Sequence, residues 1–130
     1  MRLPVNHAIS ILSRSITIFD TVKALVRGED EQTQEADRIV QGTITSPSGR
    51  DLQMLEAGEI ANGSIIVHIF SNDMIYMSDV NSTEVTTRQT FVRYDDSIWR
   101  IKQRMPRVHH GQYRRYIAVK YVDRSFDRVS

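Results

Sequence analysis

The chain has 130 residues, of which 40% are hydrophobic and 25% are charged, so we predict one globular domain over residues 1–130. It has no cysteine, which excludes disulfides, thiol nucleophiles and cysteine-ligated metals. It has no run of about 18 apolar residues and its start does not resemble a signal peptide, so we expect no membrane span and no secretion. Residues 1–14 are expected to form an N-terminal extension and 124–130 a C-terminal tail.

The net charge of +1 hides an uneven distribution along the chain. Residues 1–92 carry a net charge of −5, whereas residues 93–130 carry +6. A basic C-terminal third can indicate contact with nucleic acid, or a basic surface of one subunit that meets the acidic surface of the next. The second interpretation is favoured, because the basic residues are interleaved with acidic ones and do not form a tract.

The N-terminal third predicts a long hairpin. Residues 15–19 and 21–26 are apolar and β-branched and favour a strand that ends at Gly28. The acidic segment 29–35 is interpreted as a wide solvated loop, and residues 36–45 as the returning strand.

The middle of the chain predicts one helical turn and one central strand. After the turn at residues 46–49, residues 51–56 favour a single helical turn that Asp51 caps and Gly58 ends. Asn62 and Gly63 predict a sharp turn. The following strand, 64–70, is apolar on both faces and should be buried, whereas residues 71–88 should be irregular.

The C-terminal part predicts a hairpin and a closing strand. Strands 90–94 and 98–105 flank a turn at residues 95–97, whose type is left open because aspartate tolerates positive φ less well than glycine. In the second strand Trp99, Ile101 and Met105 should share the core face. A last strand, 112–123, should place four apolar side chains on one side: Tyr113, Ile117, Val119 and Tyr121. The fold class is therefore all-β: a small barrel or sandwich of about six antiparallel strands, with one short helical turn and long loops.

Convergent reactive groups are not found in the sequence. His109 and His110 are adjacent, and neighbours on a strand point to opposite faces, so they are not expected to share a metal. Asp95 and Asp96 fall at a hairpin tip, where a turn role is favoured over paired catalytic carboxylates. No phosphate loop and no nucleophile elbow is present. We therefore expect no catalytic, cofactor-binding or metal-binding residue, no cofactor and no enzymatic activity.

Aromatic and basic residues alternate in the C-terminal third. Trp99, Tyr113, Tyr116 and Tyr121 lie among arginines and lysines, as in small barrels that stack single-stranded nucleic acid. The favoured interpretation is that the aromatic rings pack the core and the basic side chains lie outside.

One ordered set of motifs resembles the head-completion (head-closure, neck) proteins of tailed bacteriophages. Residues 46–59 read Ser-Pro-Ser-Gly-Arg-Asp-Leu-Gln-Met-Leu-Glu-Ala-Gly-Glu, similar to the pattern Pro-x-x-Gly-x-Asp-Leu-x-x-Leu-x-x-Gly in that family. A strand, a loop, the hairpin at 94–101 and the closing strand at 111–119 follow in the same order. The resemblance covers residues 36–123. It departs from the family at Asp96, where glycine is usual, and at Trp99, where tyrosine is usual.

The resemblance implies a structural virion protein, assembled in the host cytoplasm. Such a protein forms a ring of six or twelve copies in the neck, with portal or adaptor proteins above, tail proteins below and packaged double-stranded DNA in the lumen. No membrane is involved. The isolated chain should be a monomer or a weak oligomer, and loops such as 28–35 and 71–88 can order on assembly. The alternatives are a tail-terminator or tail-completion ring, and a small nucleic-acid-binding barrel.

Three sets of residues follow from these interpretations. The expected interface residues are Arg50, Asp51, Gln53, Glu56, Arg107, His109 and Arg114. The expected structural turns contain Pro47, Gly49, Gly58, Gly63, Asp95 and Asp96. The expected core consists of Leu52, Leu55, Ile65, Val67, Trp99, Ile101, Ile117 and Val119. For Arg50 and Asp51 a second interpretation stays open, in which both residues only cap the helical turn within one chain.

Overall fold

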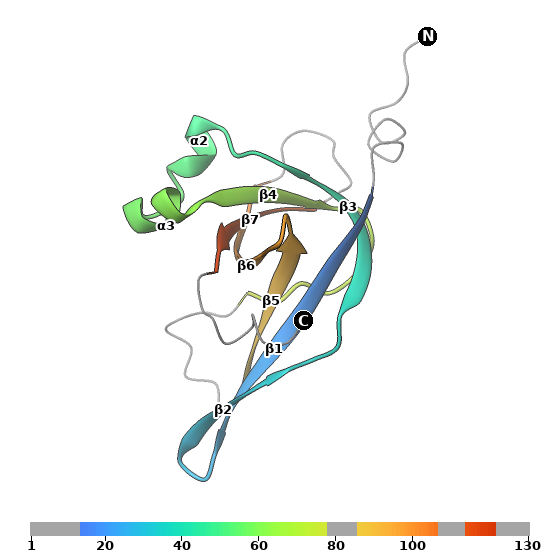
Figure 1. Ribbon diagram of the computed structural model, residues 1–130, viewed down its shortest axis with the longest axis vertical. Coiled ribbons are helices and arrows are strands. Elements are labelled where there is room, and N and C mark those ends of the chain that lie inside the picture. The colour runs from blue at the N-terminus through green and yellow to red at the C-terminus, as the bar shows by residue number, and fades with distance from the viewer. Residues whose placement is uncertain (1–13, 78–85, 107–113, 122–130) are drawn as a thin grey trace.

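The computed structural model describes residues 14–77, 86–106 and 114–121, which form seven strands and two short helices (Figure 1). The elements in chain order are β1 (Arg14–Val26), β2 (Glu29–Gln34), β3 (Arg38–Thr45), α2 (Gly49–Leu52), α3 (Ala57–Asn62), β4 (Ser64–Ile69), β5 (Thr86–Tyr94), β6 (Ser97–Arg104) and β7 (Arg114–Lys120). No helix among these residues is long and apolar enough to cross a membrane. The expected N-terminal extension, apart from Arg14, and the expected tail lie outside the described residues.

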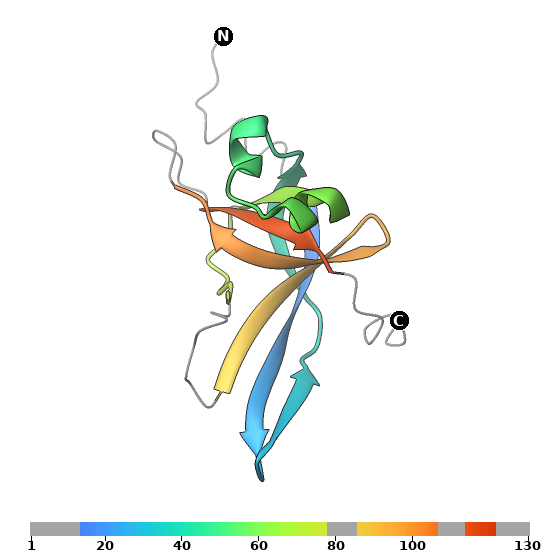
Figure 2. The same ribbon diagram turned by 90° about the vertical axis from the view of Figure 1, so that its left-hand side faces the viewer.

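The strands form a closed antiparallel barrel. Six of them pair in the order β1-β3-β4-β7-β6-β5, and β5 pairs again with β1 to close the ring. β2 is a seventh strand that pairs with the second half of β1. The all-β prediction is confirmed, and of the two architectures left open the chain adopts the barrel. The turned view in Figure 2 shows β1, β2 and β5 extending well below the rest of the barrel.

The N-terminal hairpin has a tight turn and not the wide acidic loop predicted for residues 29–35. Arg27 and Gly28 both have positive φ and join β1 directly to β2. Residues 29–34 then pair along β1 from Val26 to Thr21. The prediction was wrong because β1 supplies the backbone partners of β2, so β2 does not need an apolar face to be ordered. Residues 28–34 belong to a turn and a strand within the single chain, so they are not the loop that was expected to order on assembly.

The second hairpin joins β5 and β6 through Asp95 and Asp96. Their φ angles are 53° and 56°, so both residues take the positive φ that a type I′ turn requires. β5 begins at Thr86, inside the segment expected to be irregular, because residues 86–93 pair with β1. Residues 71–77 contain no helix or strand, and residues 78–85 lie outside the described part of the chain.

Two apolar clusters lie on opposite sides of the β4–β7 wall. The barrel interior holds Ile16, Ile18, Val40, Ile65, Val67, Ile69, Ile75, Val92, Trp99, Ile101, Tyr116 and Ala118. The outer cluster, beneath the helices, holds Leu55, Ile66, Met105, Ile117 and Val119, with Leu52 and Met54 packed against it. β4 was predicted to be apolar and buried on both faces, and the two clusters do cover both of its faces. β7 was predicted to be apolar on one side only; Tyr116 and Ala118 fill its interior face.

Met105 does not share a face with Trp99 and Ile101, although the alternation predicted it. The register between β6 and β7 shifts between Ile101 and Gln103. A bulge of this kind inserts one residue and reverses which side the following side chains take. Met105 is therefore buried in the outer cluster, whereas Trp99 and Ile101 lie in the interior.

Candidate functional site

The segment that carries most of the predicted interface residues folds as two consecutive short helices. We call residues 46–63 the cap unit. Ser48 is the N-cap of α2: its Oγ accepts a hydrogen bond from the Asp51 backbone N–H at 3.2 Å, and the Asp51 carboxylate accepts one from the Ser48 N–H at 2.9 Å. In α3, the Glu59 carboxylate accepts a hydrogen bond from the Glu56 N–H at 2.9 Å. These reciprocal bonds satisfy N–H groups that short helices otherwise leave open.

The cap unit was predicted as a single helical turn, capped by Asp51 and ended by Gly58. The N-cap residue is Ser48, and Asp51 is the third residue of α2, which completes the capping box with Ser48. Gly58 lies inside the second helix, α3. Gly63 ends α3 with a φ of 110°, a conformation that favours glycine. Pro47 directly precedes the N-cap, and Gly49 is the first residue of α2.

The cap unit is anchored to the outside of the barrel. Leu55 is buried in the outer cluster, and Leu52 packs against the same cluster. Both views in Figures 1 and 2 place α2 and α3 at the upper end of the molecule, over β4 and β7. The apolar anchor, the reciprocal cap of α2 and the Glu56–Glu59 hydrogen bond of α3 together fix the orientation of the polar side chains on the unit.

Three of the predicted interface residues of the cap unit are exposed. They are Arg50, Gln53 and Glu56, whereas Asp51 is half-buried in the cap. Within the described part of the chain, the Arg50 side chain has no hydrogen bond or ion pair. The alternative that Arg50 and Asp51 only cap the helical turn within one chain therefore holds for Asp51, which takes part in the cap, but not for Arg50.

Glu59 fastens the cap unit to β6 and was not singled out from the sequence. Its carboxylate forms ion pairs with Lys102 and, at 3.6 Å, with Arg100. Burial raises the pKa of Glu59, but the hydrogen bonds from Lys102 and the Glu56 N–H and the charges of Lys102 and Arg100 outweigh it, so the pKa is lowered overall. One carboxylate is shared by two basic side chains, which leaves a positive surplus on β6.

The remaining predicted interface residues lie away from the cap unit. Arg114 begins β7 and donates hydrogen bonds to the backbone carbonyls of Ser71 at 2.8 Å and Asp73 at 2.6 Å. Arg107 and His109 lie outside the described residues. The expected interface set is therefore not brought together at one place: the cap unit holds four members, and Arg114 holds the 71–77 segment.

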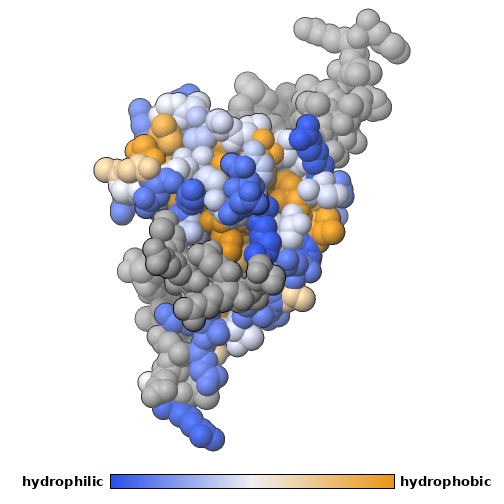
Figure 3. Space-filling view, in the orientation of Figure 1, coloured by the Kyte–Doolittle hydropathy of each residue, from blue (hydrophilic) through white to orange (hydrophobic). Residues whose placement is uncertain are grey.

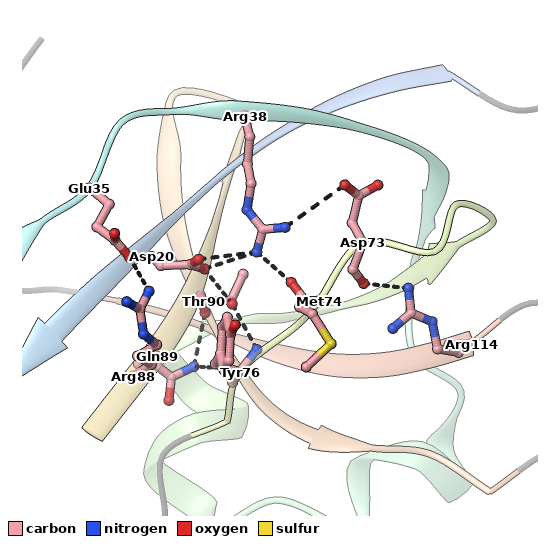
Figure 4. A network of polar contacts seen from close by, with 10 residues as sticks. All are labelled: Asp20, Glu35, Arg38, Asp73, Met74, Tyr76, Arg88, Gln89, Thr90 and Arg114. Atoms are coloured by element: carbon pink, nitrogen blue, oxygen red, sulfur yellow. Dashed lines mark hydrogen bonds and ion pairs between the residues drawn. The ribbon is translucent and has the colours of Figure 1, made fainter. Parts of the chain in front are cut away.

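A buried polar network centres on Asp20, a residue that the sequence did not point to (Figure 4). Asp20 is 7% exposed on β1 and accepts hydrogen bonds from Arg38 at 3.1 and 3.2 Å and from the Thr90 hydroxyl at 2.6 Å. Three strands, β1, β3 and β5, thus meet at one carboxylate. All these contacts come from groups fixed on neighbouring strands, so the arrangement is that of a structural ion pair.

The same network holds residues 71–77 against the barrel. Arg38 also donates to the Met74 carbonyl, and the backbones of Tyr76 and Thr90 are joined by a 2.8 Å hydrogen bond. Gln89 donates to the Tyr76 carbonyl at 3.3 Å and to the Ile101 carbonyl at 2.6 Å. Because Ile75 is buried in the interior cluster between these polar contacts, the segment 71–77 is packed onto the barrel interior.

His68 lies on the outer face of β4, below the cap unit. Its Nε2 is 3.0 Å from the Thr45 hydroxyl oxygen on β3. Burial, together with the positive charge of Arg115, lowers the pKa of His68 to about 4, and the Asp51 carboxylate opposes this only in part. The imidazole is therefore neutral at pH 7.

We expect this histidine to make stability fall in mildly acidic solution. Its folded pKa, about 4, lies below its ordinary value of 6.5, so its contribution is complete above pH 6.5 and is lost as the pH falls towards 4. The free energy of unfolding of the wild type should drop more between pH 7 and pH 4.5 than that of His68→Gln, which keeps a polar partner for Thr45. Parallel pH profiles for the two proteins would contradict the expectation.

Two aromatic residues considered for nucleic-acid stacking are inside the barrel. Trp99 is 8% and Tyr116 is 3% exposed, and both belong to the interior cluster. Tyr121 packs edge-on against Phe91 with ring centroids 5.0 Å apart. Tyr113 lies outside the described residues. Trp99, Tyr116 and Tyr121 are thus engaged in packing and do not form an open stacking platform.

Among residues 14–77, 86–106 and 114–121, no group of three or more His, Asp or Glu side chains could hold a metal ion. Comparison of the chain with known protein families and with curated proteins finds no match in either set.

Proposed function

We propose that this chain is a structural, non-enzymatic subunit of a ring in the neck of a tailed bacteriophage, where it connects the portal to the tail and helps to retain packaged DNA. The observation that carries the proposal is the cap unit. The residues in which the chain resembles head-completion proteins, 47–58, form a doubly capped, anchored unit on the outside of a closed barrel. Its exposed residues are charged or polar, and they are held in a fixed orientation.

A rigid unit with exposed polar side chains is better suited to fixing the register between subunits than to catalysing a reaction. Charged side chains on a rigid support contribute to the specificity of a contact, because a misplaced neighbour leaves charges unpaired. Arg50 is exposed, carries a full charge and has no partner within the described part of its own chain. We propose that Arg50 and Gln53 contact a neighbouring subunit or the adjacent portal-proximal ring, while Asp51 maintains the helix cap.

The proposal is tested by Arg50→Ala, Gln53→Ala introduced into the phage that carries the gene. Because both side chains are exposed and make no capping hydrogen bond, the free energy of unfolding of the isolated variant should lie within about 0.5 kcal/mol of that of the wild type. We expect DNA-filled heads without attached tails, counted by electron microscopy, and a loss of infectivity of at least tenfold.

A matched control removes one arginine and one glutamine elsewhere: Arg14→Ala, Gln41→Ala, which alters exposed residues of β1 and β3. This control should leave the particles normal. Asp51→Ala separates the cap from the contact, because it should lower the stability of the isolated chain. Normal infectious particles from Arg50→Ala, Gln53→Ala, or absence of the protein from purified virions, would contradict the proposed function.

A further inference from the structure

Helix α3 of the cap unit lies on the barrel without a buried side chain of its own. None of its six residues is buried, and Ile60, its largest apolar side chain, is 42% exposed. The space-filling view shows hydrophobic surface among hydrophilic residues at the upper left of the molecule, where the cap unit lies (Figure 3). Burial of apolar surface by α3 itself therefore does little to keep this helix in place.

The chain is fixed on both sides of α3. Before the helix, Leu55 is buried in the outer cluster. After it, the Gly63 carbonyl accepts a hydrogen bond from the Lys120 N–H of β7 at 3.0 Å. Between these two points, Glu59 makes all the hydrogen bonds and ion pairs that join α3 side chains to the described part of the barrel. The hold on the helix itself is therefore mainly electrostatic.

The basic partner Lys102 stands at the bulge of β6. The register with β7 passes from Ile101 directly to Gln103, so Lys102 is the inserted residue and has no opposite residue on β7. A bulge turns the side chain at the insertion in a new direction. The Lys102 Nζ forms an ion pair with Glu59 Oε1, so the bulge supplies the charge that α3 contacts.

The bulge is fixed from the neighbouring strand β5. The Gln89 side chain is buried, and its Nε2 donates a hydrogen bond to the Ile101 carbonyl at 2.6 Å. This carbonyl directly precedes Lys102, so the backbone next to the insertion has a partner. The position of Lys102 is therefore set within the barrel and does not depend on α3.

The three charged side chains are partly shielded from water. Those of Glu59, Lys102 and Arg100 are each less than a third exposed. Charges in such surroundings attract each other more strongly than fully exposed ones, but dissolved salt still reaches them. The Glu59 carboxylate also accepts a hydrogen bond from the Glu56 N–H at 2.9 Å. One group thus closes the start of α3 and joins this helix to β6.

We infer that Glu59 is a latch that holds α3 against β6, and that α3 opens separately from the barrel when the latch is released. Opening requires the ion pairs to break, but it removes no α3 side chain from the core. The latch is a property of the isolated chain. Its effect on tail attachment deepens the proposed function and rests on it, because α3 belongs to the cap unit that carries Arg50 and Gln53.

Amide hydrogen exchange of the full chain, followed by NMR at neutral pH, tests the latch in Glu59→Gln. The glutamine can still accept the Glu56 N–H, but it has no charge for Lys102. The reporters are the amides of Ile60 and Gly63, which donate to the Glu56 and Glu59 carbonyls at 3.0 and 3.2 Å. We expect roughly threefold to tenfold faster exchange at these amides, because two ion pairs are lost, and unchanged exchange in β4 and β7.

Salt gives a readout that a helix held by packing would not show. Raising NaCl to about 1 M should speed exchange at Ile60 in the wild type, because salt screens the ion pairs, but not in Glu59→Gln. Lys102→Gln should speed exchange in the wild type and add little in Glu59→Gln, since the two residues form one contact.

Glu56→Gln is the matched control. It removes an exposed carboxylate from the N-cap of the same helix, and this carboxylate forms no ion pair with any residue that the structure describes. Exchange at Ile60 should therefore change by less than about twofold.

Unchanged exchange at Ile60 and Gly63 in Glu59→Gln, or equal acceleration in α3 and the barrel, would overturn the inference. Wild-type α3 amides that exchange as fast as those of an unfolded peptide would also overturn it. If circular dichroism shows that Glu59→Gln does not fold, Lys102→Gln carries the same test from outside α3.

The latch and the proposed function can fail separately. Normal particles from Arg50→Ala, Gln53→Ala, together with faster α3 exchange in Glu59→Gln, would remove the proposed function and retain the latch. Tail-less particles from the first variant, with unchanged α3 exchange in the second, would do the reverse.

Discussion

Replacing Trp99 with alanine should lower the free energy of unfolding by about 3–5 kcal/mol, the usual range for removing a buried aromatic side chain. The indole is 8% exposed within the interior cluster, and its Nε1 donates a 2.9 Å hydrogen bond to the Tyr94 carbonyl. The substitution would thus open a cavity in the barrel and remove the donor that ties β6 to the end of β5. Chemical denaturation followed by circular dichroism measures the effect.

Trp99→Phe is the matched control, because it keeps most of the apolar volume but lacks the indole N–H. It should cost less than the alanine variant. A Cβ atom at Gly63 would lie 3.8 Å from the indole ring, so the ring lies close to the end of α3. A loss below about 1 kcal/mol for Trp99→Ala would contradict its place in the core.

The second large effect is expected for Asp20→Ala, which should lower the free energy of unfolding by about 2–3 kcal/mol. The variant leaves Arg38 and the Thr90 hydroxyl without their shared acceptor, and breaking a buried pair by removing one partner is costly. The cost is set below that of a fully buried pair because the Arg38 side chain is 29% exposed and water can reach it.

The exposed ion pair between Glu35 and Arg88 provides the control. Both side chains are about two-fifths exposed, so Glu35→Ala should change stability by less than about 0.5 kcal/mol. Because the Asp20 network holds residues 71–77, Asp20→Ala should also speed amide hydrogen exchange at Tyr76, whose N–H donates to Thr90. Equal stability losses for the two variants would contradict a structural role of the buried pair.

The sequence predicted the elements in which pattern and environment agree. The β5–β6 hairpin was predicted near its correct position because its arms alternate around a two-residue turn. β4 was predicted to be buried on both faces because it has no polar face, and the barrel interior and the cap unit cover its two sides. In these cases the local sequence pattern and the tertiary packing favour the same structure.

The errors occurred where tertiary pairing overrides local composition. β2 has no apolar residue. It is a strand because β1 continues beyond the barrel and supplies the backbone hydrogen-bond partners of β2. The bulge before Gln103 cannot be seen in the alternation of β6, since it depends on the register with β7. Asp20 and Thr90 are 70 residues apart in the chain, so no local pattern connects them.

The site was partly accessible from the sequence. The spacing of Ser48 and Asp51 matches a capping pattern, and this signal could have corrected the role of Asp51. Glu59 gives no comparable signal, because its partners Arg100 and Lys102 come from β6 through tertiary packing. The exposure of Arg50 likewise depends on how the cap unit lies on the barrel.

Barrel closure has a consequence for the order in which the chain can fold. β1 pairs with β3 across a short stretch of sequence, but its other edge pairs with β5, where Phe19 lies opposite Phe91. During synthesis at about 5–20 residues per second, that edge waits several seconds before β5 leaves the ribosome. Such distant pairing slows folding and leaves an apolar strand edge open to other nascent chains. Variants that weaken β5 should therefore lower the yield of soluble protein in cells more than their effect on equilibrium stability predicts.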